Sequence, residues 1–322
     1  MGSIGSALIR GVPPLVALVG ATATGKSALG LALAAALDGE IVNADALQVY
    51  RGFDLGTAKP TREERARVRH HLLDILEPQQ RFSAGEFARR AAAAIADIRG
   101  RGRLPIVVGG SGFYLRALLE GIAPLPAADP AIRAALRQRL TAAGPEALAA
   151  ELRSLDPETA ARLSPRDTQR VLRALEVVHT TGRPLPRWIA EQPFGRARVA
   201  ATRVGLTLPR AVLYDRIGVR VRGMRERGLA AEVEGLLASG LDPGLPAFQA
   251  IGYRQFARHA RGEWTLERAV EETIRATRRF AKRQETWFRK EPGVTWFDAR
   301  DEEAVRTAVL AHIRRSVSLE DS

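Results

Sequence analysis

The segment Gly20–Ser27 has the residue types and spacing of a loop that binds phosphate groups. It reads Gly20, Ala21, Thr22, Ala23, Thr24, Gly25, Lys26 and Ser27, which fits the pattern GxxxxGK[ST]. Glycine lets successive backbone N–H groups turn toward one anion, and a helix N-terminus adds partial positive charge. Lys26 can reach the outer phosphate, and the Ser27 hydroxyl can ligate Mg²⁺. This phosphate loop predicts a di- or triphosphate site and leaves the identity of the ester open.

A carboxylate follows the next apolar segment of the chain. Asp45 comes directly after Glu40–Asn43 and Ala44, and the strand order of a parallel sheet would place it near the phosphate loop. There it could act as a general base for a nucleophile that approaches a phosphate ester. An equally good alternative is the N-cap of a helix over Leu47–Tyr50. The later strand Leu104–Val108 ends in Gly-Gly-Ser rather than in the Asp that holds the metal of an NTPase, which disfavours ordinary nucleotide hydrolysis.

A basic segment near the C-terminus is the second chemical signal. Arg275–Lys290 contains seven basic residues and one acidic residue, with three aromatic residues between them. The whole chain has a formal charge of +13, which favours a polyanionic partner such as nucleic acid. Compositional drift toward arginine, and an amphipathic helix with a solvated face, are the plain alternatives. The side chains predicted to contact RNA phosphates here are Arg278, Arg279, Lys282 and Arg283.

The elements that must position these residues alternate between strand and helix at both ends of the chain. Before residue 121 we expect strands at Leu15–Val19, Glu40–Asn43 and Leu104–Val108, and helices at Ser27–Leu37 and from Ser83 to about Arg99. Between residues 121 and 200 only helices are expected, at Ala131–Ala143, Glu146–Leu155 and Thr168–Thr180. Strand and helix signals then return, including a long helix from about Thr265 to Lys290. The sequence predicts an α/β fold, a P-loop NTPase-like parallel sheet core (1–121 and 201–322) with an inserted all-helical subdomain (122–200).

The amino-acid composition excludes several classes of protein and of chemical site. The 322 residues include no cysteine, which excludes disulfides, cysteine-ligated zinc and thiol nucleophiles. No apolar run approaches the ~20 residues of a membrane span. His70 and His71 are interpreted as structural hydrogen-bonding residues rather than metal ligands. We expect a cytoplasmic monomer that binds no membrane.

Several motifs together resemble the tRNA dimethylallyltransferase (isopentenyl-tRNA transferase) family. The resemblance runs from about Leu15 to Phe297 and is specific, because the phosphate loop alone is common whereas the segments that follow it are not. They are Asn43–Gly52, Asp54–Pro60, His70–Asp74, Gly109–Ser111, Gln169–Glu176, Gly252–Gln255 and Lys282–Gln284.

The resemblance implies a reaction and roles for residues. Dimethylallyl diphosphate and a tRNA anticodon stem-loop would be the substrates, with Mg²⁺ as cofactor. The dimethylallyl group would pass to the exocyclic amine of adenine 37, just 3′ of the anticodon, in tRNAs that read codons beginning with U. Asp45 falls on the general base, Ser111 on a position usually held by Thr, and Arg220 on a residue that helps to hold the diphosphate. Family positions that contact tRNA are matched by Asp45, Ala46, Leu47, Gln48, Ser111, Arg133, Gln169, Arg170, Val171, Leu172 and Arg173.

Three departures and three rival interpretations accompany this resemblance. Ala46 stands where the family often has Ser, Ala21 stands where Pro is frequent, and Gly112 and Phe113 also differ from the commoner residues. The rivals are a small-molecule P-loop kinase, a transferase that prenylates free adenine nucleotides, and a non-catalytic RNA-binding module. The absence of an Asp after the third predicted strand disfavours the first. The helical insertion and basic helix disfavour the second, and the intact phosphate loop with Asp45 disfavours the third.

Overall fold

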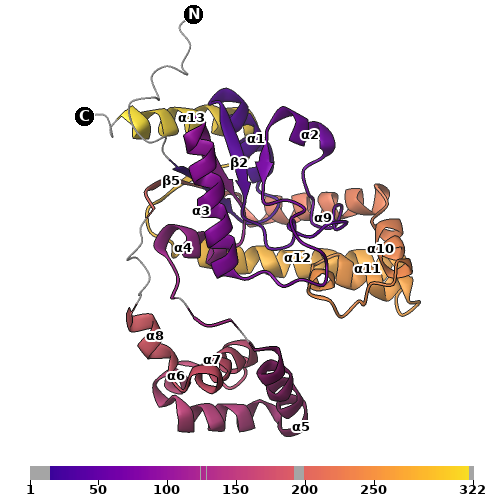
Figure 1. The fold of residues 1–322 in the computed structure, drawn as a ribbon. Helices are drawn as coiled ribbons and strands as arrows, with labels where there is room; N and C mark the ends of the chain where they lie inside the picture. The colour runs from indigo at the N-terminus through magenta and orange to yellow at the C-terminus, as the bar shows by residue number, and fades with distance from the viewer. Residues whose placement is uncertain (1–14, 124, 128, 192–198, 319–322) are drawn as a thin grey trace, which may run out of the picture. The chain divides into compact units, whose positions relative to one another are not determined.

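A six-stranded parallel sheet is the centre of the fold in the computed structural model of the chain (Figure 1). The structure describes residues 15–123, 125–127, 129–191 and 199–318. The strand order is β3-β2-β4-β1-β5-β6, and all neighbouring strands run parallel. The strands are β1 Leu15–Gly20, β2 Gly39–Asn43, β3 His70–His71, β4 Leu104–Val108, β5 Ala201–Thr207 and β6 Val294–Asp298.

The chain divides into two compact units. The core unit comprises Met1–Leu118 and Val199–Ser322, and the helical unit comprises Leu119–Arg198. The core unit contains the sheet and the helices α1 Lys26–Ala36, α2 Arg62–Arg67, α3 Ala84–Gly100, α9 Arg210–Glu226, α10 Leu229–Ala238, α11 Tyr253–Ala260, α12 Leu266–Phe288 and α13 Glu302–Ser318, with a 3₁₀ helix at Pro246–Gln249. Helix α4, Gly112–Glu120, ends at the boundary. The helical unit contains α5 Pro130–Leu155, α6 Pro157–Arg162, α7 Thr168–Thr181 and α8 Leu185–Glu191.

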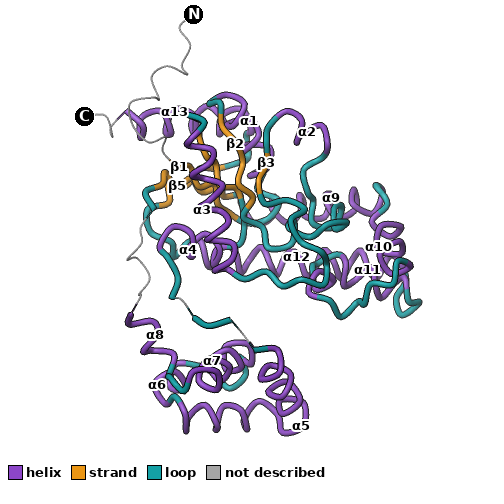
Figure 2. The backbone as a smooth tube through the Cα atoms, in the orientation of Figure 1, coloured by secondary structure: helices purple, strands orange, loops and turns teal. Residues whose placement is uncertain are grey.

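The sheet of the core unit is buried by the helices packed around it. Every residue of β1, β2 and β4 is buried, as expected for parallel strands covered by helices. Helix α1 packs on β1, β2 and β4, α3 on β2 and β4, α12 on β1, and α13 on β5 and β6. Helices α9 to α12 also pack on one another, and Figure 2 shows them as a group of purple tubes beside the orange strands. This confirms the predicted α/β fold.

Local chemistry fixes where several helices begin. The Ser83 hydroxyl accepts the N–H of Glu86 at 3.1 Å at the start of α3, which confirms the predicted N-cap. The Thr265 hydroxyl does the same for Arg268 at the start of α12. In α5 the backbone of Gly144 has φ 77° and divides the element into two helices. The division lies between the two helices that the sequence predicted for this region.

Some elements differ from the sequence-based expectation. Strand β3 and the short helices α2, α4, α6, α8 and α11 were not predicted, because each is too short to show a clear period. Gly182 ends α7 in the left-handed region, and α8 begins three residues later at Leu185.

The parallel arrangement brings the carboxyl ends of the strands to one edge of the sheet. The phosphate loop follows β1, Asp45 follows β2, and Ser111 follows β4. The order β2-β4-β1 makes these three segments neighbours. Ligands of open α/β sheets bind at this edge, so this is where the candidate site is built.

Candidate active site

The phosphate loop depends on backbone conformations that favour glycine. Gly20 has φ +142°, and a Cβ there would lie 2.6 Å from the Leu206 carbonyl oxygen. Gly25 has φ +92° and opens α1 in the left-handed region. Both glycines are therefore required by the turn itself. The loop places the N-terminus of α1 behind any anion that enters, as in other phosphate-binding loops.

Lys26 is buried inside this loop and folds back on it. Its Nζ donates to the Ala21 carbonyl at 2.5 Å, and the Thr24 hydroxyl donates to the same oxygen at 2.9 Å. Burial, and then the nearby Arg220, lower the pKa of Lys26 to about 7, while Asp45 opposes this change. Ser27 is exposed. Burial makes this ammonium costly to keep charged, so it would gain strongly from an anion beside it.

Asp45 lies in a turn and not at the start of a helix. Its Oδ1 accepts the N–H of Leu47 at 2.9 Å, but residues 47–49 form a bend and a turn, and Tyr50 pairs with Leu76 in an isolated bridge. The alternative that Asp45 caps a helix over Leu47–Tyr50 is therefore wrong, because the N–H groups are used by a local side-chain turn instead. Burial raises the pKa of Asp45, and the N–H groups, Arg220 and Lys26 partly reverse this effect.

Ser111 joins the end of β4 to the segment that carries Asp45. Its hydroxyl accepts the N–H of Ala46 at 3.3 Å, and its own N–H donates to the Ala44 carbonyl at 3.4 Å. A Cβ on Gly109 would lie 2.2 Å from that same carbonyl oxygen, so glycine is needed for this close approach. The hydrogen bond to residue 46 is made by its backbone N–H and so does not depend on the Ala46 side chain.

Arg220 reaches the same region from α9. It interacts electrostatically with both Asp45 and Lys26. Burial lowers its pKa from the usual value, Asp45 raises it, and Arg227 lowers it. The structure therefore brings Lys26, Asp45 and Arg220 together from the phosphate loop, the β2 edge and a distant helix. Two cations within electrostatic reach of one carboxylate suit an anion more highly charged than Asp45 itself.

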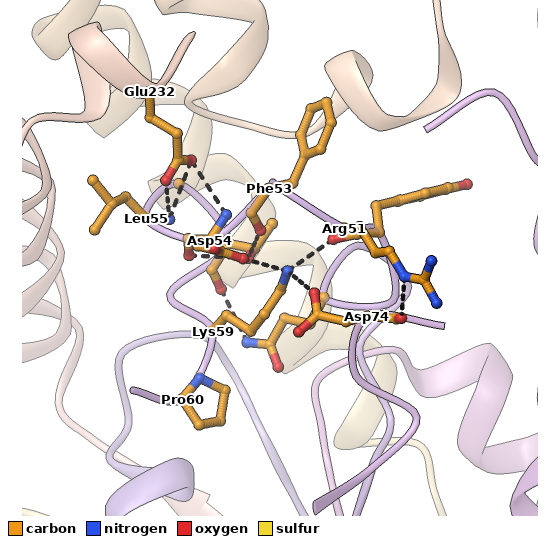
Figure 3. A network of polar contacts seen from close by, with 12 residues as sticks. Arg51, Phe53, Asp54, Leu55, Lys59, Pro60, Asp74 and Glu232 are labelled. Atoms are coloured by element: carbon orange, nitrogen blue, oxygen red, sulfur yellow. Dashed lines mark hydrogen bonds and ion pairs between the residues drawn. The ribbon is translucent and has the colours of Figure 1, made fainter. Parts of the chain in front are cut away.

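The segment after Asp45 is held by a buried ion network (Figure 3). The Lys59 ammonium is almost fully buried and donates to the Asp54 and Asp74 carboxylates and the Tyr50 carbonyl at 2.5, 2.6 and 2.8 Å. The Glu232 carboxylate accepts the N–H groups of Asp54 and Leu55 at 3.2 and 3.0 Å. Sequence reasoning placed Lys59 in a motif but gave it no role, although it is one of four lysines in the chain.

The side chain of Gln48, which was predicted to contact tRNA, forms hydrogen bonds within the same segment. Its Nε2 donates to the Thr57 and Ala58 carbonyls at 3.0 and 3.1 Å. Its amide therefore closes the segment that contains Lys59. The shape of the segment is thus set by the buried Lys59 ammonium together with carboxylates that are partly exposed.

Helix α12 presents a basic face formed by Arg279, Lys282 and Arg283, whose side chains are exposed. The guanidinium of Arg283 lies 5.7 Å from the centre of the Phe280 ring. Arg278 lies differently, because its guanidinium packs over the Tyr214 ring at 5.1 Å and is half-buried. Three of the four residues predicted to contact RNA on this helix therefore share an open surface.

The predicted tRNA-binding residues of the helical unit occupy three kinds of environment. Gln169 and Arg170 are exposed at the start of α7, whereas Val171 and Leu172 are buried in the unit's core. Arg133 and Arg173 both pair with the carboxylate of Glu176, which is 1% exposed. Arg173 also donates to the Pro126 carbonyl at 2.7 Å. These two arginines thus connect α5, α7 and the segment before α5.

The two histidines of β3 have the structural roles expected from the sequence. His71 Nε2 lies 2.6 Å from the buried Glu40 carboxylate, and His70 Nδ1 lies 2.7 Å from the Val68 carbonyl. Arg101 also binds Glu40 at 2.7 Å. Across the described ranges, no group of three or more His, Cys, Asp or Glu side chains could hold a metal ion. None of the helices in the same ranges has both the length and the apolar character of a membrane span.

Fold and site together define a P-loop-type α/β protein that holds a carboxylate beside an anion-binding loop. The sequence model of the IPP transferase family matches residues 48–291. A tRNA dimethylallyltransferase of Trichlorobacter lovleyi is 50% identical over 88% of this chain and 93% of its own length. That of Syntrophobacter fumaroxidans is 47% identical over 96% of this chain and 90% of its own. The chain therefore belongs to the IPP transferase family.

Solved structures agree with this assignment. The full-length tRNA isopentenylpyrophosphate transferase of Bacillus halodurans is 39% identical, has a TM-score of 0.70, and is matched over 96% of this chain and 98% of its own. A eukaryotic dimethylallyltransferase, described as acting on tRNA, is 28% identical with a TM-score of 0.78. The match covers 90% of this chain and 75% of that one.

Proposed function

We propose that this chain transfers a dimethylallyl group from dimethylallyl diphosphate to the exocyclic amine of adenine 37 in tRNA. The observation that carries the proposal is that the phosphate loop with Lys26 and the turn with Asp45 follow strands that end at one edge of the sheet, with Arg220 within electrostatic reach of both. A phosphate loop beside two cations suits a diphosphate leaving group. The Asp45 carboxylate can accept the proton that the attacking amine loses.

The proposed reaction breaks one bond and forms another, and the protein must stabilise the charge that moves in each change. The bond between the allylic carbon and the diphosphate oxygen breaks, and its electron pair leaves with diphosphate. A bond forms between the same carbon and the adenine nitrogen, which supplies its lone pair and loses a proton to Asp45. Stabilising the departing anion is the larger task, because each preorganised donor of this type is worth about 3 kcal/mol. Proton transfer to Asp45 contributes about 10²–10⁴-fold.

Lys26 and Arg220 act on the leaving group. Both have lowered pKa values in the free protein, because both are buried. An anion in the loop would reverse this effect for Lys26, so the positive charge is strongest when substrate is present. The N–H groups at the start of α1 would add their partial charges.

The site also fits a magnesium ion held through one protein hydroxyl. Ser27 is exposed at the first turn of α1. In proteins Mg²⁺ usually takes most of its ligands from phosphates and water, so a single hydroxyl next to a diphosphate is a suitable protein ligand. When bound, the ion would neutralise diphosphate charge. We therefore include Mg²⁺ as the cofactor.

The RNA would be held by its phosphates and read at one base. The basic face of α12, with Arg279, Lys282 and Arg283, is suited to backbone phosphates. Gln169 and Arg170 are exposed on the helical unit and are assigned the same role. An adenine stacked in an anticodon loop must leave the stack before its amine is accessible, as in other base-modifying enzymes. The predicted contacts by Val171 and Leu172 would have to be made through their backbones, because both side chains are buried.

The proposal is tested by weighing the RNA. The protein is incubated with an anticodon stem-loop, Mg²⁺ and dimethylallyl diphosphate, and the RNA is analysed by mass spectrometry. We expect one C₅H₈ unit to be added, on the adenine 3′ of the anticodon. A second arm replaces the prenyl ester by ATP, and phosphate transfer in that arm would indicate a kinase. A third arm offers free AMP as acceptor, and efficient prenylation there would place the chain among nucleotide prenyltransferases.

A further inference from the structure

One amide side chain lies between the two halves of the candidate site. Gln284 of α12 is 7% exposed. Its Oε1 accepts the N–H of Thr22 at 2.8 Å, and its Nε2 donates to the Gly110 carbonyl at 2.9 Å. Both ends of one amide are therefore used, one on the phosphate loop and one on the segment after β4.

Each of these two contacts is adjacent to a group that the proposed reaction needs. Thr22 belongs to the phosphate loop that would hold the diphosphate. Gly110 directly precedes Ser111, whose hydroxyl accepts the N–H of Ala46 beside Asp45. The amide of Gln284 thus fixes the spacing between the leaving-group side and the base side. An error of about 1 Å in such a spacing can reduce a rate by about 10²-fold.

The chain leaves room for this amide at Gly110. A Cβ on Gly110 would lie 2.2 Å from Nε2 of Gln284, a separation at which the side chain must move. The backbone of Gly110 is not in the left-handed region, so alanine there carries no conformational strain of its own. One turn further along α12, the Trp287 ring packs against Gly112 in the same manner. Helix α12 is therefore seated closely on residues 110–112.

We propose that Gln284 is a positioning residue that sets the distance between the phosphate loop and the Asp45–Ser111 side of the site. The proposal deepens the proposed prenyl transfer and rests on it. Gln284 touches no substrate in this assignment and acts through the backbones of Thr22 and Gly110. It also links the loop to the helix that carries the basic face of Arg279, Lys282 and Arg283.

The test uses Gln284→Ala and Gly110→Ala, singly and together, in the full chain. Gln284→Ala leaves a backbone donor and a backbone acceptor without their partners. We expect kcat to fall about 10- to 100-fold, because a misplacement of about 1 Å between the reacting groups can reduce a rate by about 10²-fold. The KM for the stem-loop should stay within about 3-fold, because the basic face is untouched. Gly110→Ala should lower kcat in the same way by displacing the amide.

The double variant separates positioning from general damage. With no long side chain at 284, a methyl group at 110 meets nothing that it must displace, so Gly110→Ala should have no further effect in the Gln284→Ala background. Glu271→Ala is the matched control, because Glu271 is exposed on the same helix, and it should keep full activity. Thermal unfolding of each variant is measured beside the kinetics.

Three results would overturn the proposal. One is an unchanged kcat in Gln284→Ala. Another is an effect of Gly110→Ala that multiplies with it. The third is a fall in activity that is fully accounted for by the fraction of unfolded protein. Binding of inorganic diphosphate with Mg²⁺, followed by calorimetry, gives a readout that does not need prenyl transfer, and we expect Gln284→Ala to weaken it about tenfold. If the wild-type chain prenylates no RNA, the proposed function fails, while these titrations still decide the role of Gln284.

Discussion

Replacing Lys26 by methionine should stabilise the ligand-free protein while removing its binding of diphosphate. Methionine fills a similar space without a charge. The pKa of Lys26 falls from 10.5 to about 7 on folding, first because of burial and then because of Arg220. At 1.36 kcal/mol per pH unit, this difference corresponds to about 5 kcal/mol. That is the order of magnitude of the free energy that the folded state loses by holding the ammonium without an anion.

The sign of the pH dependence follows from the lowered pKa. Between about pH 7 and pH 10.5, the unfolded chain binds a proton at Lys26 that the folded chain lacks. The free energy of unfolding of the wild-type protein therefore rises with pH in this window, by about 1.4 kcal/mol per pH unit from this residue alone. Below pH 7 both states are protonated and the full loss is present.

The assay compares urea unfolding of the wild type and Lys26→Met at several pH values. The variant should be more stable at pH 7.5, and its advantage should shrink by about 2.7 kcal/mol at pH 9.5. Lys26→Arg is the matched control, because arginine stays charged across this range and should show no recovery at high pH. A stability difference that does not change with pH, or a wild type that is the more stable protein at pH 7.5, would refute the reasoning.

Other consequences of the site can be measured separately. Asp45→Asn should lower kcat by about 10²–10⁴-fold with little change in stem-loop affinity by gel shift; near-normal turnover would remove Asp45 as the base. Because burial raises the pKa of Asp45, wild-type kcat should fall as the pH drops through that raised value, and a flat acidic limb of the pH profile would contradict this. Lys59→Met should lower the free energy of unfolding by about 2 kcal/mol, which is less than for a fully enclosed ion pair because Asp54 and Asp74 are partly exposed. Lys59→Arg tests whether a positive charge alone suffices. An unchanged urea midpoint for Lys59→Met would show that the ion network does not stabilise the fold. Alanine at Arg279, Lys282 and Arg283 together should weaken RNA binding and flatten its salt dependence by about 0.7–0.9 per lost phosphate contact, with Arg278→Ala as the comparison; an unaltered slope would leave the basic face a structural role.

The parallel sheet and the phosphate loop could be predicted from the sequence. Buried parallel strands give short continuous apolar runs, and Leu15–Val19 and Leu104–Val108 are such runs. The position of Asp45 near the loop also follows, because strands that run parallel end at one edge. Excluding the helix cap required coordinates, because a cap depends on where the N–H groups after Asp45 point.

The parts that could not be predicted depend on contacts between residues far apart in the chain. Gln284 lies 262 residues from Thr22, and no local pattern marks an amide that will bridge two loops. The same holds for Glu176, whose burial directs Arg133 and Arg173 inward. A sequence shows that arginines are present, but only packing decides which of them face solvent.

The break in α5 has a practical consequence. At Gly144 the backbone turns into the left-handed region, and nothing lies within 4 Å of the position that a side chain would take. Extra residues added at such a point meet solvent rather than packed atoms. A short peptide tag could therefore be inserted beside Gly144, with the glycine itself retained, as a handle on the helical unit in solution.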